Sequence, residues 1–200
     1  LEGVITSGTA RGRGIDRPAA VALAALDAGT AGRVVNRLVH HAFRVAKRVR
    51  NETGIGANAV SISYMAVELG KKIFDSLKGR TALLIGAGEM AELSARHLLN
   101  AGVSRVMVSN RTGAAAEELA HAFGGDAVNF DRLADHLAEA DVVICSTGAN
   151  EYVVTEAMAR DALTRRRNRP SFFIDISVPR NIDPAVSNIP NVFLFDIDDL

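Results

Sequence analysis

The sequence has one cysteine, Cys145, in 200 residues, and it has no excess of charge of either sign. A single cysteine excludes an internal disulfide bond and favours a reducing cytoplasm as the compartment. A formal net charge of zero excludes an overall basic surface as an argument for nucleic-acid binding. No run of about 18 or more apolar residues occurs, and the N-terminus lacks the layout of a signal peptide, so the sequence predicts neither a membrane span nor secretion.

Hydrophobic residues make up 48% of the chain and charged residues 23%, which is typical of a globular protein with a substantial core. We divide the chain into an irregular N-terminal remnant with a short helix over 18–28 (residues 1–28), a helical connector (29–77) and a nucleotide-binding domain (78–200). The chain begins at Leu1 rather than Met, so we expect it to be a fragment or a processed product.

The connector is predicted to hold two helices, over 33–52 and 61–77. In the first helix, apolar residues recur every three to four positions and form one stripe. The opposite face, here termed the basic ridge, carries cations and no acid: Arg33, Arg37, Arg44, Lys47, Arg48 and Arg50. Such a ridge is typical of a solvated helix face, and a surface that meets nucleic-acid phosphate is the alternative.

From residue 78 onward, short apolar runs alternate with amphipathic segments. Strands are predicted at 81–85, 105–109, 127–130, 142–145, 172–175 and 192–195, and helices at 90–101, 114–123, 133–140 and 155–167. Strands without polar alternation, separated by helices, indicate a parallel sheet covered on both faces. The predicted fold class is therefore α/β, a doubly wound parallel sheet of the Rossmann type that is preceded by a helical connector segment.

A glycine-rich turn lies between the first of these strands and the helix that follows it. Its residues match the G-x-G-x-x-G/A pattern: Gly86, Ala87, Gly88, Glu89, Met90 and Ala91. The pattern alone is weak, but a preceding strand and a following helix are the context that it requires. We expect a dinucleotide pyrophosphate at this turn and the N-terminus of its helix, and a purely structural turn is the alternative.

The end of the second strand indicates which dinucleotide is bound. An NAD-binding domain usually carries an acid there, about 20 residues after the glycines, to hold the ribose 2′-hydroxyl. This chain instead has Ser109, Asn110, Arg111 and Thr112, and no acid occurs before Glu117. Because Arg111 can pair with a 2′-phosphate that a carboxylate would repel, the predicted cofactor is NADP(H).

Thr147 and Gly148 follow the fourth strand, and we expect them beside the ribose and nicotinamide. Cys145, just before them, closes an apolar strand without a nearby His or Lys, so we interpret it as a buried, unreactive thiol rather than a nucleophile. The five histidines lack the spacing of metal ligands. No catalytic residue and no metal site are assigned.

Several segments together resemble glutamyl-tRNA reductase, from about Asp27 to the last residue. They are Asn36-Arg37-Leu38, Thr53-Gly54-Ile55-Gly56, residues 60–64, residues 66–69, the turn 86–91, residues 109–112, Ser146-Thr147-Gly148, residues 175–180 and residues 196–200. In that family, a cysteine of an N-terminal catalytic domain attacks glutamyl-tRNA and forms a thioester. NADPH then reduces the thioester to glutamate-1-semialdehyde for tetrapyrrole, and hence porphyrin and heme, synthesis.

The resemblance implies that this chain supplies the connector and the NADPH domain. It also implies glutamyl-tRNA as substrate, a homodimer formed through a further domain, and the downstream glutamate-1-semialdehyde aminomutase as a partner. The family's nucleophile cysteine is not found in this sequence, so we expect the chain alone to bind NADPH without reducing charged tRNA. Two alternatives remain: an NADP-dependent dehydrogenase of the shikimate dehydrogenase type, and a regulatory module that senses NADPH without catalysis.

Overall fold

The computed structural model describes Ala25 and residues 28–29, 32–52 and 58–199. The chain forms two compact units, Leu1–Asn58 and Ala59–Leu200. The predicted remnant over 1–28, with its short helix, lies almost entirely outside the described residues. No helix in the described part is both long enough and apolar enough to cross a membrane.

In the first unit, helix α2 spans Arg33–Glu52, as the hydrophobic period predicts. Where its apolar stripe is described, it is exposed: the exposed fraction is 82% for Val34 and 65% for Leu38. In the basic ridge, Arg37, Arg44 and Arg48 are exposed, and Arg48 pairs with Glu52 at 3.2 Å. The side chains of Arg33, Lys47 and Arg50 lie outside the described set, so the choice between a solvated face and a phosphate-binding ridge stays open.

The second unit is built on a six-stranded parallel sheet. The strands are β1 (Thr81–Ile85), β2 (Arg105–Ser109), β3 (Asp126–Val128), β4 (Val142–Cys145), β5 (Ser171–Asp175) and β6 (Val192–Asp196). Their order is β3-β2-β1-β4-β5-β6. The strands on both sides of β1 pair with it in parallel, but the direction in which successive strands are added to the sheet reverses between β1 and β4. This is the doubly wound Rossmann-type fold that the sequence predicts, and the reversal is where such folds bind ligands.

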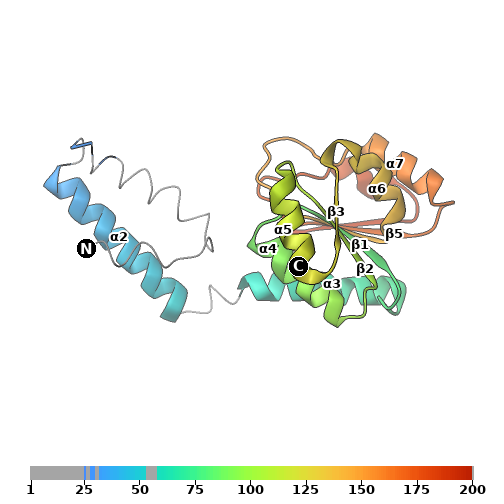
Figure 1. Ribbon diagram of the computed structural model, residues 1–200, viewed down its shortest axis with the longest axis horizontal. Helices are drawn as coiled ribbons and strands as arrows, with labels where there is room; N and C mark the ends of the chain where they lie inside the picture. Colours follow the sequence, from blue (N-terminus) through green and yellow to red (C-terminus); the bar gives the residue numbers. More distant parts are fainter. Residues whose placement is uncertain (1–24, 26–27, 30–31, 53–57, 200) are drawn as a thin grey trace. The chain divides into compact units, whose positions relative to one another are not determined.

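Helices cover both faces of this sheet (Figure 1). One layer contains α3 (Asn58–Phe74), α4 (Glu89–Asn100) and α5 (Gly113–Phe123), and the other contains α6 (Leu133–Glu139), α7 (Glu156–Arg165) and the 3-10 helix η4 (Pro184–Asn188). Neighbouring strand residues face opposite layers: Leu84 packs with the first and Leu83 with the second. Burial on both faces explains why the strands read as unbroken apolar runs.

Several predicted boundaries are wrong: helix α3 begins at Asn58 rather than Ser61, and three ends differ for local backbone reasons. Helix α3 ends at Phe74 rather than Leu77, because Asp75 adopts a left-handed φ of 58°. Helix α7 ends at Arg165 rather than Arg167, whose φ is 56°. Strand β3 stops at Val128, because the Asn129 side chain accepts from the Asp131 amide at 2.8 Å and caps the 3-10 helix η3 (Phe130–Arg132).

Candidate functional site

The glycine turn joins the end of β1 to the start of α4. Gly86 has a φ of 109°, and a Cβ at this position would lie 2.1 Å from the Ser146 carbonyl oxygen. Its amide donates to the Ser109 carbonyl at 2.8 Å. The turn is therefore held between the ends of β2 and β4, at the reversal of the sheet, and only glycine fits this backbone.

Gly88 precedes α4 and has a different role. Its backbone is extended, it offers no side-chain cap to the helix, and a Cβ added there would meet nothing within 4 Å. The first turn of α4 thus has no side-chain cap, and the space beside Gly88 is open, which suits an anion such as a pyrophosphate. Ala91 is buried against the core, so the helix approaches β1 closely.

The other predicted residues of this turn differ in accessibility. Ala87 and Met90 are half-buried and pack on the core cluster of the α3–α5 layer. Glu89 is exposed, and its carboxylate has no partner among the described side chains. A carboxylate stabilises a helix N-terminus but repels a phosphate at the same place. The Glu89 backbone amide therefore suits a bound dinucleotide, whereas its carboxylate does not.

The turn after β2 offers positive charge. Arg111 is exposed and has no ion pair or hydrogen bond within the described residues. Thr112 precedes α5 without capping it, and the first turn of that helix contains no acid. The Asn110 side chain donates to the Thr112 carbonyl at 3.0 Å and shapes the turn. A free guanidinium, a free hydroxyl and an uncapped helix together suit a phosphate monoester.

Ser109 differs from its three neighbours, although the sequence groups all four as donors. Its side chain is fully buried, and its hydroxyl oxygen has no hydrogen-bond partner. The structure therefore does not bring this hydroxyl to the surface beside Arg111. Its carbonyl, which accepts from Gly86, is the atom that shapes the site.

The turn after β4 contains Thr147 and Gly148. The Thr147 hydroxyl donates to Asn181 Oδ1 and accepts from the Ala149 amide at 3.1 Å. Gly148 is exposed, and a Cβ there would meet nothing within 4 Å. This turn lies against Gly86, because Ser146 supplies the carbonyl that crowds it. The predicted pyrophosphate and nicotinamide residues are thus adjacent at the carboxyl edge of the sheet.

Asp175, at the end of β5, organises the neighbouring loop. Its buried carboxylate accepts from three backbone amides: Ser177 at 3.0 Å, Asn181 at 2.7 Å and Ile182 at 2.7 Å. The sequence contained a signal for this role, because an acid that closes an apolar strand must be paired or hydrogen-bonded when buried. Sequence reasoning did not assign Asp175 or Asn181 to the site.

Cys145 is fully buried beside Asp175. Burial, with a smaller contribution from the Asp175 charge, raises the pKa of the thiol to about 12. A thiol must ionise to act as a nucleophile, and this one is both protonated and inaccessible. No group of three or more metal-ligating side chains occurs in the part of the chain that the structure describes.

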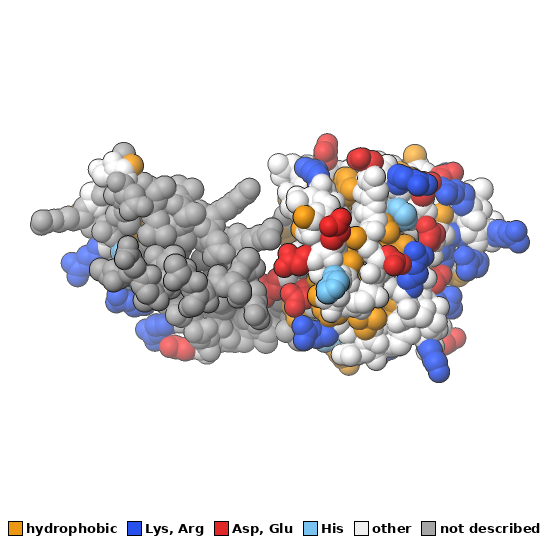
Figure 2. All heavy atoms as spheres, in the orientation of Figure 1, with side chains coloured by type: hydrophobic (Ala, Val, Ile, Leu, Met, Phe, Trp, Pro, Cys, Tyr) orange, Lys and Arg blue, Asp and Glu red, His pale blue; other side chains and the backbone are white. Residues whose placement is uncertain are grey.

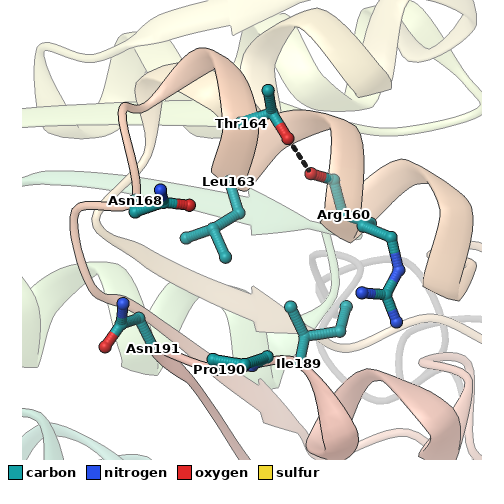
Figure 3. Close-up of a pocket in the computed structure, with 7 residues that line it drawn as sticks. All are labelled: Arg160, Leu163, Thr164, Asn168, Ile189, Pro190 and Asn191. Carbon is teal, nitrogen blue, oxygen red and sulfur yellow. Dashed lines mark hydrogen bonds between the residues drawn. The ribbon is translucent and has the colours of Figure 1, made fainter.

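A separate pocket of about 340 Å³ lies between α7 and the start of β6 (Figure 3). Leu163 and Ile189 line its apolar part, and Arg160, Asn168 and Asn191 contribute polar groups. It contains none of the predicted site residues and lies at the amino end of β6, away from the glycine turn. Over the visible face of this unit, acidic and basic side chains are interspersed (Figure 2).

Comparison with known proteins gives consistent matches. Residues 68–200 match the model of the family described as shikimate / quinate 5-dehydrogenase. The glutamyl-tRNA reductase of Maridesulfovibrio salexigens is 56% identical over 176 residues, which is 88% of this chain and 40% of that protein. That of Nitratidesulfovibrio vulgaris (strain DSM 19637 / Miyazaki F) is 59% identical over 167 residues, which is 84% of this chain and 38% of that protein.

The solved structure of glutamyl-tRNA reductase from Methanopyrus kandleri superposes with a TM-score of 0.67 at 43% identity, and the match covers 86% of this chain and 43% of that one. The chain thus spans about 40% of the length of the curated relatives that it matches. Fold, glycine turn and sequence lead to the same assignment. The chain belongs to the shikimate / quinate 5-dehydrogenase family of domains, and within it the chain is a homologue of the glutamyl-tRNA reductases.

Proposed function

We propose that this chain binds NADPH and supplies the hydride-donor part of a glutamyl-tRNA reductase, which converts glutamyl-tRNA to glutamate-1-semialdehyde in tetrapyrrole synthesis. The observation that carries the cofactor assignment is Arg111, an exposed guanidinium without a partner in the described residues, at the strand end where an NAD-binding domain carries an acid. The high identity to proteins named glutamyl-tRNA reductase supports the reaction.

The residues present fit NADPH in three places. The open space at Gly88 and the uncapped start of α4 would hold the pyrophosphate. Arg111 and Thr112 would hold the 2′-phosphate, and the turn at Thr147 and Gly148 would border the nicotinamide half. When bound, the dinucleotide supplies a hydride to an acyl carbon. The protein's task is to orient the dinucleotide and to leave its reactive face accessible at the carboxyl edge of the sheet.

The acyl-accepting thiol is not Cys145, whose buried sulfur cannot meet a tRNA-bound ester. We therefore assign the nucleophile to another part of the whole reductase. The homodimer and the contact with glutamate-1-semialdehyde aminomutase are likewise proposed for the whole reductase. The chain alone should bind NADPH without consuming it in the presence of glutamyl-tRNA. Turnover of glutamyl-tRNA by the purified 200-residue chain would contradict this assignment.

The absence of a reactive thiol also favours a second candidate, a module that senses NADPH without catalysis. A reading frame that continues upstream of Leu1 into a domain with a reactive cysteine would select the reductase. An initiating Met close to Leu1 would select the module.

Titration with NADPH and NADH, followed by nicotinamide fluorescence, tests the cofactor. NADPH should bind about tenfold tighter or more, because the 2′-phosphate adds a charge-assisted contact to Arg111. Replacement Arg111→Ala should remove most of this preference and leave NADH binding nearly unchanged. Tighter binding of NADH by the unaltered chain would overturn the assignment.

A further inference from the structure

Two loops at the carboxyl edge of the sheet are joined through one side chain, that of Asn181. Its Oδ1 accepts from the Thr147 hydroxyl, and its Nδ2 donates to the Ala149 carbonyl at 2.9 Å and the Glu151 carbonyl at 3.0 Å. The backbone amide of Asn181 donates to the Asp175 carboxylate at 2.7 Å. Asn181 thus ties the loop after β4 to the end of β5, across more than 30 residues of sequence.

Asn181 has an exposed fraction of 0%, so no ligand can touch its side chain. Whatever it contributes to binding must pass through the turn that it holds. In that turn, the Thr147 hydroxyl hydrogen is committed to Asn181, and the Thr147 amide donates to Ser177 Oγ at 3.1 Å. Gly148 is exposed, and its amide has no partner among the described residues. The bonded network therefore leaves the Gly148 amide as a free donor of the turn.

We propose that Asn181 is a positioning residue for the nicotinamide half of the cofactor: it fixes the Thr147–Ala149 turn so that the free amide of Gly148 faces the ligand. This inference rests on the proposed function. The adenosine half lies elsewhere, because Arg111 and Thr112 follow β2, and no hydrogen bond links Asn110, Arg111 or Thr112 to Asn181 within the described residues. Loss of Asn181 should therefore weaken the two halves of the site unequally.

The experiment compares two ligands on the full chain by calorimetry. NADPH spans both halves, whereas adenosine 2′,5′-bisphosphate carries the 2′-phosphate and lacks the nicotinamide. Asn181→Ala should lower NADPH affinity about tenfold, because buried hydrogen bonds that shape the turn are lost. Affinity for adenosine 2′,5′-bisphosphate should stay within about twofold, since nothing near Arg111 changes. Asn188→Ala is the matched control, because Asn188 is exposed and its side chain makes no hydrogen bond in the described part.

Thr147 provides a second pair of variants in case Asn181→Ala does not fold. Thr147→Val keeps the shape and removes the hydroxyl, so it should show the same selective loss of NADPH affinity. Thr147→Ser keeps the hydroxyl and should retain clearly more NADPH affinity than Thr147→Val. If Asn181 had only a structural role, its loss would instead lower the affinity for both ligands equally, in parallel with the melting temperature.

The outcomes separate this inference from the proposed function. If the unaltered chain binds both ligands and Asn181→Ala retains NADPH affinity, or loses both affinities equally, the positioning role is overturned and NADPH binding stands. If the unaltered chain binds neither ligand, the proposed function itself is overturned. If Thr147→Ser loses as much NADPH affinity as Thr147→Val, the bond to Asn181 is not what matters, and the inference is again overturned.

Discussion

The guanidinium of Arg166 donates to the carboxylate of Asp141 at 2.6 Å, and the Arg166 side chain has an exposed fraction of 0%. The same guanidinium donates to the Ala138 and Pro170 carbonyls, while Asp141 accepts from the Thr81 amide at 3.1 Å. This pair links the starts of β1, β4 and β5 at the edge of the sheet opposite the glycine turn.

Removal of one partner of this pair should destabilise the fold without changing the cofactor site. Arg166→Ala leaves the Asp141 charge without its buried partner, so the free energy of unfolding should fall by about 3–5 kcal/mol. Urea denaturation measures it. Arg167→Ala is the control: Arg167 is exposed and its side chain has no partner in the described residues, so this change should alter stability little. An Arg166→Ala chain as stable as the parent would show that the pair contributes nothing.

The two glycines of the turn should respond differently to alanine. Gly86→Ala places a methyl 2.1 Å from the Ser146 carbonyl at a φ of 109°, so the fold should lose about 3 kcal/mol or more. Gly88→Ala meets open space and should leave the melting temperature nearly unchanged while lowering NADPH affinity, because the methyl occupies the room for the pyrophosphate. Equal effects of both substitutions on stability would contradict these distinct roles.

Glu89 should oppose the binding of a phosphate at the start of α4. Glu89→Gln removes an exposed carboxylate and should raise NADPH affinity about two- to fivefold at low salt, with a smaller gain at high salt. Glu92→Gln is the comparison, because Glu92 already pairs with Arg96 at 3.3 Å and should change affinity less. A loss of affinity on Glu89→Gln would mean that this side chain contributes favourably to the bound state.

Cys145 should make stability fall in alkaline solution. Burial raises the pKa of this thiol from its ordinary value near 9.0 to about 12 in the folded chain. Because the folded form holds the thiol proton more tightly, the stabilisation is present below about pH 9 and declines as the pH rises toward 12. The slope from this group approaches about 1.4 kcal/mol per pH unit in that window.

Cys145→Ala lacks the thiol, so the difference in unfolding free energy between the two proteins, followed against pH, isolates this effect. A difference that does not vary with pH would contradict the raised pKa. The same burial predicts that a thiol reagent labels Cys145 only after denaturation.

The basic ridge gives a prediction about tRNA. If it meets phosphate, replacing Arg37, Arg44 and Arg48 by alanine should weaken tRNA binding and reduce its salt dependence. Filter binding at several salt concentrations measures both. An unchanged salt slope would support a solvated helix face.

Much of the nucleotide-binding unit could be predicted from local sequence. Apolar runs located all six strands, and Gly86 and Gly88 stand where a strand meets a helix. The end of α3 was predicted wrongly because Asp75 adopts a left-handed backbone conformation that the local sequence does not indicate. Asn181 was missed for a different reason: its partners, Thr147 and Ala149, are more than 30 residues away, and only the parallel pairing of β4 with β5 brings them together.

Gly86 is fixed from both sides: its amide donates to the Ser109 carbonyl, and the Ser146 carbonyl lies in close contact with it. This arrangement has a consequence for cofactor exchange. A turn fixed by its neighbours loses little conformational entropy when a ligand arrives. In the proposed reductase, oxidised and reduced dinucleotide would then replace one another at this turn without rearrangement of the sheet edge.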